Sequence, residues 1–163
     1  MSVKKRVVIW AMVLGAVLIS PMSGFAGGVG EQNVELVKQL YVPLNAGDFQ
    51  GFLDLLTDDV EWYIPGNEEV LPWAGSTRGK DQVANLFGVI LAENLKLELF
   101  EQLDYAPLGE DKVVVLGRER FRIIATGKSV EFEMVHVYTI RNGKIAKNRI
   151  YEDTAPIEAA FRR

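Results

Sequence analysis

The chain contains 163 residues, of which 22 are acidic and 18 are basic, and it has one histidine and no cysteine. An acidic chain of this kind argues against nucleic acid and anionic membranes as partners. A single histidine without cysteine argues against a zinc site and rules out disulfide bonds, and we expect neither a metal nor a cofactor.

The first 26 residues have the layout of a secretory signal peptide. A basic stretch, Lys4–Arg6, precedes the apolar run Val7–Ile19, and Gly24–Ala26 offers small residues for cleavage. The alternative is a membrane anchor, but the 13 apolar residues fall short of the roughly 20 that a spanning helix needs. We therefore expect cleavage after Ala26 and export to the periplasm or the extracellular space, with no membrane contact afterwards.

The next part of the chain predicts helices. After a flexible leader at residues 27–30, apolar residues recur every three or four positions, as in amphipathic helices, over three segments: Glu31–Asn45, Asp48–Leu56 and Lys80–Glu93. Pro43 should kink or end the first helix, because proline cannot donate to the helical ladder. A short strand at Val60–Ile64 and a long loop at residues 67–78, with Trp73, separate the second helix from the third.

The second half of the chain changes to the alternating pattern of strands. Four strands are predicted, joined by turns at residues 107–111, Thr126-Gly127 and Asn142-Gly143: Lys96–Tyr105, Lys112–Ala125, Ser129–Ile140 and Lys144–Asp153. Helices followed by antiparallel strands indicate an α+β fold with the helices on one face of a sheet. We expect one domain over residues 31–156 and a C-terminal tail at residues 157–163.

His136 lies in the middle of a predicted strand, and the strand pattern suggests a partner for it. A two-residue turn at Thr126-Gly127 would pair Gly117 with His136 and place Glu119 diagonal to His136 on the same face. The carboxylate could then orient the ring and raise its pKa, so that the two act as general acid and base. The alternative is that His136 is a buried polar residue satisfied by its neighbours.

Apolar side chains on the same face would wall the site. The candidate ligand-binding residues are Trp62, Ile64, Trp73, Phe121, Phe132 and Met134. A mostly apolar wall with few converging polar groups is typical of sites for small apolar molecules, here one bearing a carbonyl group.

The inward face of the last strand depends on the turn at Asn142-Gly143. A two-residue type I′ turn would place His136 opposite Arg149, on the face that also holds Lys147, Tyr151 and Asp153. A three-residue turn with a glycine bulge would place His136 opposite Asn148, on the face that also holds Ile150 and Glu152.

Three runs of the sequence, AGDFQGFLDLLTDDVEWYIPG, PWAGSTRGKDQVANLF and HVYTIRNGKI with RIYEDTA, resemble the SnoaL-like branch of the nuclear transport factor 2-like superfamily. That superfamily also contains ketosteroid isomerase. The resemblance spans nearly all of Glu31–Pro156. It implies a curved sheet closed into a cone by three helices, with a ligand pocket at the open end, and it favours the bulged turn, with Asn148, Ile150 and Glu152 among the pocket residues.

The resemblance also shows that the catalytic residues of known relatives are missing. Ketosteroid isomerases have their aspartate base at the position of Ile64, and epoxide hydrolases and polyketide cyclases have a catalytic aspartate at the position of Ile150. The protonated aspartate of the isomerases matches His136. Two hypotheses follow: a cofactor-free isomerase, lyase or cyclase that uses His136 and Glu119, or a non-catalytic binding or assembly module. Relatives suggest a homodimer through the outer sheet face, here Val135, Val137 and Thr139.

Overall fold

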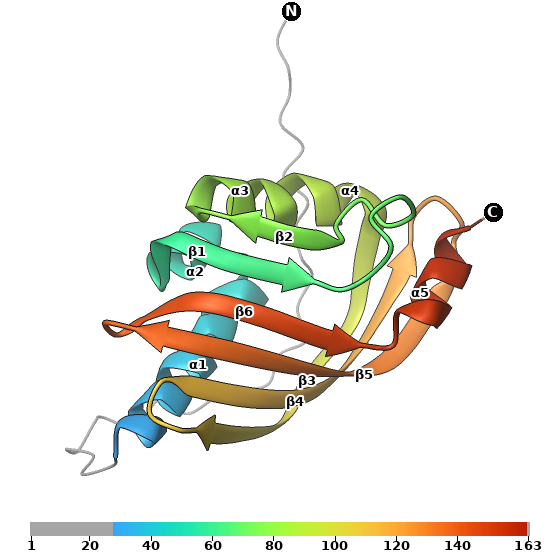
Figure 1. Cartoon of the computed structure of the whole chain (residues 1–163). Coiled ribbons are helices and arrows are strands. Elements are labelled where there is room, and N and C mark those ends of the chain that lie inside the picture. Colours follow the sequence, from blue (N-terminus) through green and yellow to red (C-terminus); the bar gives the residue numbers. More distant parts are fainter. Residues whose placement is uncertain (1–27, 163) are drawn as a thin grey trace, which may run out of the picture.

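The computed structural model describes residues 28–162 as helices packed against one six-stranded sheet (Figure 1). The predicted signal peptide lies outside the described residues. In chain order the elements are α1 (Val29–Ala46), α2 (Phe49–Asp54), β1 (Leu56–Ile64), β2 (Gly75–Arg78), α3 (Lys80–Asn85), the π-helix η1 (Leu86–Leu91), α4 (Ala92–Asn94), β3 (Leu95–Leu108), β4 (Lys112–Ile123), β5 (Ser129–Arg141), β6 (Lys144–Glu152) and α5 (Thr154–Phe161). No helix within this range has the length and apolar character of a membrane span.

The first helix buries the predicted apolar stripe, including Val37 and Leu40. It already begins at Val29, inside the predicted leader. Pro43 does not end it, because the carbonyl that proline leaves without a donor belongs to Gln39, which is exposed. The helix ends where Gly47 adopts a φ of 70°.

The segment after α1 contains three departures from the sequence pattern. Asp48 caps α2 as expected, accepting a hydrogen bond from the Gly51 N–H at 3.0 Å, but β1 already begins at Leu56, where the pattern predicted helix. The predicted loop at residues 67–78 contains the short strand β2. The third helix widens into a π-helix over its second half, which keeps Leu86 buried.

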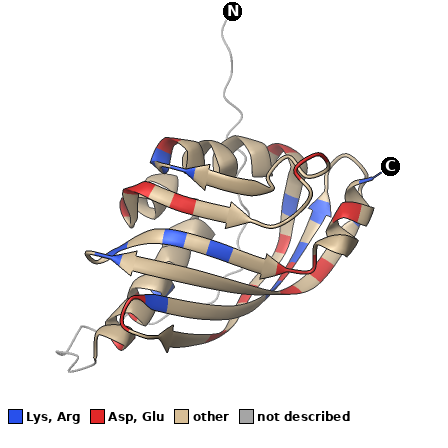
Figure 2. Ribbon diagram, in the orientation of Figure 1, with Lys and Arg blue, Asp and Glu red and all other residues tan. Residues whose placement is uncertain are grey.

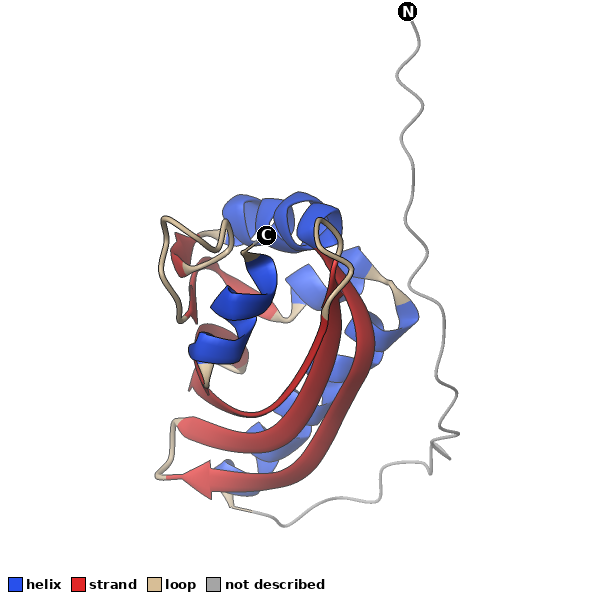
Figure 3. Ribbon diagram, turned by 90° about the vertical axis from the view of Figure 1, so that its right-hand side faces the viewer, coloured by secondary structure: helices blue, strands red, loops and turns tan. Residues whose placement is uncertain are grey.

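The sheet is mixed and strongly curved. Its strand order is β2-β1-β6-β5-β4-β3, with β1 and β6 parallel and the other neighbours antiparallel. Figure 3 shows the long strands curving around the helices, with the C-terminal helix α5 against the concave side. The α+β prediction is confirmed, and the concave face of the sheet holds the hydrophobic core.

The loop of the β4–β5 hairpin is two residues longer than predicted, and the strand register is shifted by two residues. A four-residue loop closed by Ile123 and Lys128 replaces the two-residue turn, and the Ile123 N–H donates to the Lys128 carbonyl at 2.8 Å. Gly117 therefore pairs with Met134 rather than with His136. Because the shift is an even number of residues, every side chain keeps its predicted face but gains different neighbours.

The β5–β6 hairpin has features of both alternatives, but His136 pairs with Ile150, whereas the two turns predicted Arg149 or Asn148 as its partner. Asn142 and Gly143 have φ angles of 53° and 70°, which fit the tight type I′ turn. A bulge then follows between Ile145 and Lys147 and changes the alternation along β6. The inward residues are consequently the set that the bulged turn predicted, although the bulge lies in the strand: Asn148, Ile150 and Glu152.

Gly117 provides the space in which Met134 lies. A Cβ built on Gly117 would overlap the Met134 side chain and would lie 2.7 Å from the Glu101 carbonyl oxygen. We expect Gly117→Ala to lower the free energy of unfolding by about 2 kcal/mol, because strand backbone cannot move aside as a side chain can. Urea unfolding would measure the change. Gly88→Ala, where a Cβ meets nothing within 4 Å, is the control, and equal stability of the two variants would contradict the prediction.

Candidate functional site

The concave face of the sheet collects the predicted site residues. Strands β1, β4, β5 and β6 turn one set of alternate side chains toward the helices. Glu119 and Glu152 share this face and are half-buried, whereas Trp73 is buried and approaches from the loop between β1 and β2. The remaining predicted residues are all buried: Trp62, Ile64, Phe121, Phe132, Met134, His136, Asn148 and Ile150.

Three polar side chains form a buried hydrogen-bonded chain between α1 and β5. The hydroxyl oxygens of Tyr41 and Tyr138 lie 2.7 Å apart, and the Tyr138 hydroxyl lies 3.0 Å from His136 Nδ1. Burial raises the pKa of both tyrosines, so their hydroxyl groups remain protonated at neutral pH. Phe100 packs against this chain, with ring centroids 5.5 Å from Tyr41 and 6.3 Å from His136.

The buried chain can run in two directions. If Tyr41 donates to Tyr138 and Tyr138 donates to His136 Nδ1, the neutral imidazole carries its proton on Nε2. If His136 Nδ1 donates to Tyr138 and Tyr138 donates to Tyr41, the Tyr41 O–H is the donor left without an acceptor. In both directions His136 Nε2 has no partner among residues 28–162. In the first direction His136 presents a free, buried N–H donor.

Two more unpartnered polar side chains are neighbours of His136 and Tyr138. Trp62 Nε1 and both polar side-chain atoms of Asn148 are buried without a hydrogen bond inside the described chain. Asn148 is the register partner of Trp62 on β1 and of Tyr138 on β5, so the three strands bring these groups side by side. A buried group without a partner costs about 1–3 kcal/mol. The cluster, which we call the donor cluster (Trp62, His136 and Asn148), can therefore bind an acceptor atom such as a carbonyl oxygen.

The expected pair of His136 and Glu119 is not formed. In the observed register Glu119 lies opposite Phe132 and His136 lies opposite Val115, four residues apart along the strand instead of diagonal. Burial lowers the pKa of His136 to about 3, the opposite of the predicted rise, because no carboxylate stabilises the charged ring. The ring is therefore neutral at physiological pH.

Glu119 and Glu152 instead approach one another on either side of Met134. Met134 pairs with Glu152 on β6 and with Gly117 on β4, two residues before Glu119. Neither carboxyl group has a hydrogen bond or ion pair within the described residues. Burial against apolar walls, together with the neighbouring Glu152 charge, raises the pKa of Glu119 to about 8, and burial raises the pKa of Glu152 to about 7. Each of these two carboxyl groups can therefore gain or lose a proton near neutral pH.

Aromatic rings close the end of the concave face next to α5. The Trp73 ring lies 5.5 Å from Phe161 and 6.5 Å from Phe121, which in turn lies 5.3 Å from Phe132. The last residues of the chain, predicted as a tail, therefore include a helix that packs on the site. The Thr126 hydroxyl fixes this helix by donating to the Ala160 carbonyl at 2.9 Å.

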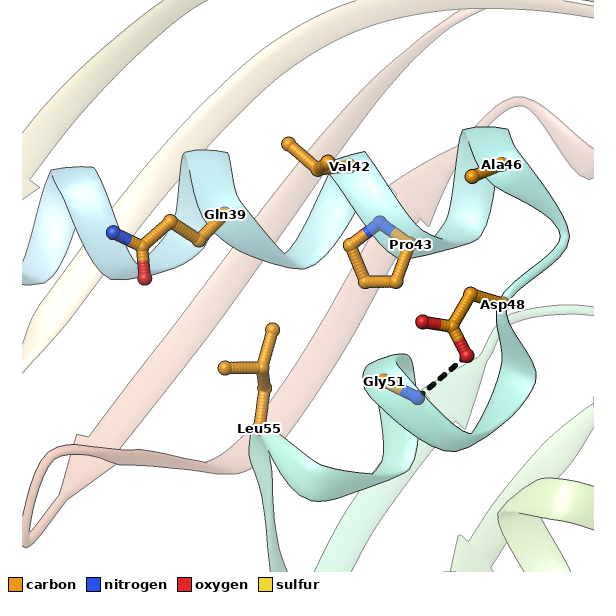
Figure 4. Close-up of a pocket in the computed structure, with 7 residues that line it drawn as sticks. All are labelled: Gln39, Val42, Pro43, Ala46, Asp48, Gly51 and Leu55. Carbon is orange, nitrogen blue, oxygen red and sulfur yellow. Dashed lines mark hydrogen bonds between the residues drawn. The ribbon is translucent and has the colours of Figure 1, made fainter. Parts of the chain in front are cut away.

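Two grooves on the molecular surface lie away from these residues. One, of about 390 Å³, runs between α1 and α2, where Asp48 caps Gly51 (Figure 4); it is lined by Gln39, Val42, Pro43, Ala46, Asp48, Gly51 and Leu55. The other, of about 410 Å³, lies at the start of α3 and is lined by Asp58, Arg78, Gly79, Lys80, Asp81 and Gln82. Neither groove includes a member of the donor cluster or a predicted site residue.

Charged residues lie along the strands of the sheet (Figure 2), and the ion pairs that they form lie on its outer face. Ion pairs of 2.7–3.8 Å link three arginines of β4 to acids of β3 and β5: Arg118, Arg120 and Arg122 with Glu98, Glu101 and Glu131. The residues of the predicted dimer patch, Val135, Val137 and Thr139, lie beside this ladder and are half-buried. Leu116 and Tyr151, the neighbours of Val135 across the sheet, are 45% and 52% exposed.

Sequence reasoning missed several polar members of the site. Tyr138 lies two residues after His136 in an alternating strand, so both side chains face the same side of the sheet. This alternation is a signal that could have identified Tyr138. Tyr41 is on the buried stripe of α1, but its contact with Tyr138 joins residues 97 positions apart. Gln102, whose Nε2 is also buried and unpartnered, lies opposite Gly117. Its strand contains two irregularities, so simple alternation does not predict which face Gln102 occupies. Among residues 28–162 there is no group of His, Cys, Asp and Glu side chains that could hold a metal ion.

Comparison with known proteins gives the same picture of the fold. A family model described as a SnoaL-like domain matches residues 37–148. An NTF2-like protein from Burkholderia xenovorans LB400 is 30% identical, with a TM-score of 0.73 over 81% of this chain and 97% of that one. TerC, co-crystallized with polyporic acid, is 22% identical, with a TM-score of 0.68 over 80% and 98%. A proposed polyketide cyclase from Xanthomonas campestris pv. campestris is 16% identical, with a TM-score of 0.69 over 83% and 100%.

The search of functionally curated proteins gave no significant match. The matches below 25% identity show a common fold alone, while the first shares both fold and sequence over almost its whole length.

Proposed function

The chain belongs to the SnoaL-like family of the nuclear transport factor 2-like superfamily, and on this premise we propose that its concave interior binds a small apolar molecule through a carbonyl oxygen. The observation that carries the proposal is the donor cluster. His136 Nε2, Trp62 Nε1 and the Asn148 amide are buried and unpartnered on neighbouring strands. A ligand oxygen would restore the hydrogen bonds that these groups lack, and the aromatic walls fit the apolar remainder of the molecule.

The same interior supports proton transfer next to the bound carbonyl. Glu152 is diagonal to His136 across β5 and β6, because His136 pairs with Ile150. The ionised Glu152 carboxylate would take a proton from the carbon beside the carbonyl, and the electron pair would move to the oxygen, where the His136 and Trp62 N–H groups stabilise the negative charge. Return of the proton to another carbon gives isomerisation, and return to a leaving hydroxyl gives dehydration. Attack of the enolate carbon on a second carbonyl of the same ligand gives cyclisation, in which the new alkoxide oxygen takes the proton from Glu152.

Replacement of the Trp62 N–H tests this binding mode. We expect Trp62→Phe to weaken binding of 1-acetonaphthone about fivefold, the equivalent of one hydrogen bond of about 1 kcal/mol, because phenylalanine keeps the aromatic wall and removes the donor. Binding of 1-ethylnaphthalene, which lacks the oxygen, should not change. Titration calorimetry would measure both affinities.

A matched control for this test is Tyr63→Phe, because Tyr63 is the next residue along β1 and faces away from the interior, where Arg149 stacks on it at 4.3 Å. Equal affinity of the wild type and Trp62→Phe for the ketone would contradict the proposal.

The second candidate function is a non-catalytic module that assembles through its outer face. It is favoured by an apolar row that crosses three neighbouring strands, in which Leu116 and Tyr151 are exposed and Val135 between them is half-buried. A homodimer that buries this row would be detected by analytical ultracentrifugation, and a purely monomeric protein at high concentration would exclude it. Turnover of a bound ketone would separate the enzyme from the module.

We also propose export, which N-terminal sequencing would test by finding Gly27 as the first residue.

A further inference from the structure

Two aromatic rings hold the guanidinium group of Arg149 on the outer face of the sheet. It lies 4.3 Å from the centroid of the Tyr63 ring on β1 and 5.7 Å from that of Tyr151, two residues further along β6. Arg149 is nevertheless exposed, and it makes no hydrogen bond or ion pair with any residue from 28 to 162. Stacking orients the planar group and leaves its N–H edges open, and such an edge matches the two oxygens of a carboxylate.

The acid on the same part of the outer face, Glu61, already binds two other cations. Glu61 lies two residues before Tyr63 on β1, and its two carboxylate oxygens lie 3.0 Å from Arg78 and from Lys147, one each. Blue bands on β6 lie beside a red band on β1 in Figure 2. Three cations, including Arg149, therefore share one acid here, which gives a local excess of positive charge in a chain whose net charge is −4.

The arginines of β4 differ from Arg149 because this chain supplies their acids. Three arginines, which we call the arginine ladder (Arg118, Arg120 and Arg122), each form ion pairs with glutamates of β3 or β5. Their charges are compensated within the sheet. Arg149, by contrast, offers its donors to a group from outside the chain.

Apolar side chains surround Arg149 on the outer face. Val137 is its register partner on β5, and Val135 is the register partner of Tyr151. Both valines are half-buried, whereas Tyr151 is 52% exposed. Tyrosine and arginine are enriched at protein–protein interfaces and contribute much of their binding free energy. This surface, which we call the Arg149 face (Tyr63, Val135, Val137, Arg149 and Tyr151), therefore has the composition of a protein-binding site.

We propose that the Arg149 face binds an acidic segment of another protein, in which a glutamate or aspartate lies next to an apolar residue. The carboxylate would form a bidentate pair with the guanidinium group, and the apolar residue would pack on the tyrosine rings. Because the rings already hold the guanidinium group, binding costs little additional side-chain entropy. A second copy of this chain would bring the same excess of positive charge to the contact, so charge complementarity favours a different, acidic partner.

An NMR titration of the folded protein with matched peptides tests this proposal. The probe is the blocked pentapeptide Gly-Glu-Phe-Glu-Gly, and its control has glutamine in place of both glutamates. At low ionic strength we expect the acidic peptide to move the Nε–H resonance of Arg149 and to bind at least about fivefold more tightly than the glutamine peptide. Arg149→Gln should remove this difference. Arg120→Gln, in the arginine ladder, is the matched control and should leave both affinities unchanged.

Several results would overturn the proposal. They are no binding of the acidic peptide, equal binding of the two peptides, an unchanged preference in Arg149→Gln, or equally large shifts at the arginine ladder. A wild-type dimer that Arg149→Gln dissociates would show that a second copy occupies the face. Binding to phosphatidylglycerol vesicles without binding to the peptide would show a membrane surface instead. The Arg149 face lies outside the concave interior, so each result can be read whether or not the interior binds a ketone.

Discussion

Replacing Tyr138 with phenylalanine should lower the free energy of unfolding by about 3–4 kcal/mol. The Tyr138 hydroxyl is the middle of the buried chain and bonds Tyr41 on one side and His136 on the other. Its removal leaves two buried polar groups without partners, at a cost of about 1–3 kcal/mol each. The aromatic ring remains, so the packing with Trp62 is retained. Urea unfolding followed by fluorescence would give the difference.

Tyr41→Phe is the matched control for Tyr138→Phe. It removes one hydroxyl from the end of the chain, and Tyr138 can still donate to His136. We therefore expect a loss of only about 1 kcal/mol. If the two variants were equally stable, the buried chain would not have the direction or the continuity described above.

Glu119→Gln should stabilise the protein increasingly as the pH rises. The pKa of Glu119 is about 8 in the folded state, above its ordinary value of 4.5, so the folded protein retains a proton that the unfolded chain loses. The contribution of this group is fully present below pH 4.5 and is lost as the pH rises toward 8. Relative to its difference from wild type at pH 4, the variant should gain about 2 kcal/mol by pH 8.5, a value reduced for the partial exposure of the side chain.

Glu152→Gln should behave in the same way, with the gain complete nearer pH 7, because the pKa of Glu152 is about 7. Unfolding curves of both variants and of the wild type at several pH values would measure these gains. A difference between variant and wild type that does not depend on pH would show that the carboxyl groups are solvated like ordinary surface acids.

Local patterns predicted most of the fold. The apolar stripe of α1, the α+β order and the alternation of β1, with Trp62 inward, depend on residues close together in the sequence, and each is confirmed. The inward direction of His136 and Asn148 also follows from alternation once the turn and the bulge of the last hairpin are known. The face that a strand residue occupies is a robust prediction, because a shift of the strand register by two residues does not change it.

The neighbours of each site residue were much harder to predict. The four-residue β4–β5 loop moved Glu119 away from His136, since loop length and not strand pattern sets the register. The contact of Tyr41 with Tyr138 depends on how α1 packs across the sheet, which no local pattern encodes. The helical end of the chain was missed because α5 has only eight residues and owes its stability to packing through Ile157.

The most direct test of the account is a ¹⁵N NMR measurement of the single histidine with and without 1-acetonaphthone. We expect a neutral ring whose proton is on Nε2 from pH 7 down to below pH 5, since burial lowers the pKa of His136 to about 3. We also expect the Nε2–H resonance to move when the ketone binds, because this proton is donated to the carbonyl oxygen. A ring that titrates near pH 6.5 and does not respond to the ketone would contradict the claim that the concave interior is a binding site.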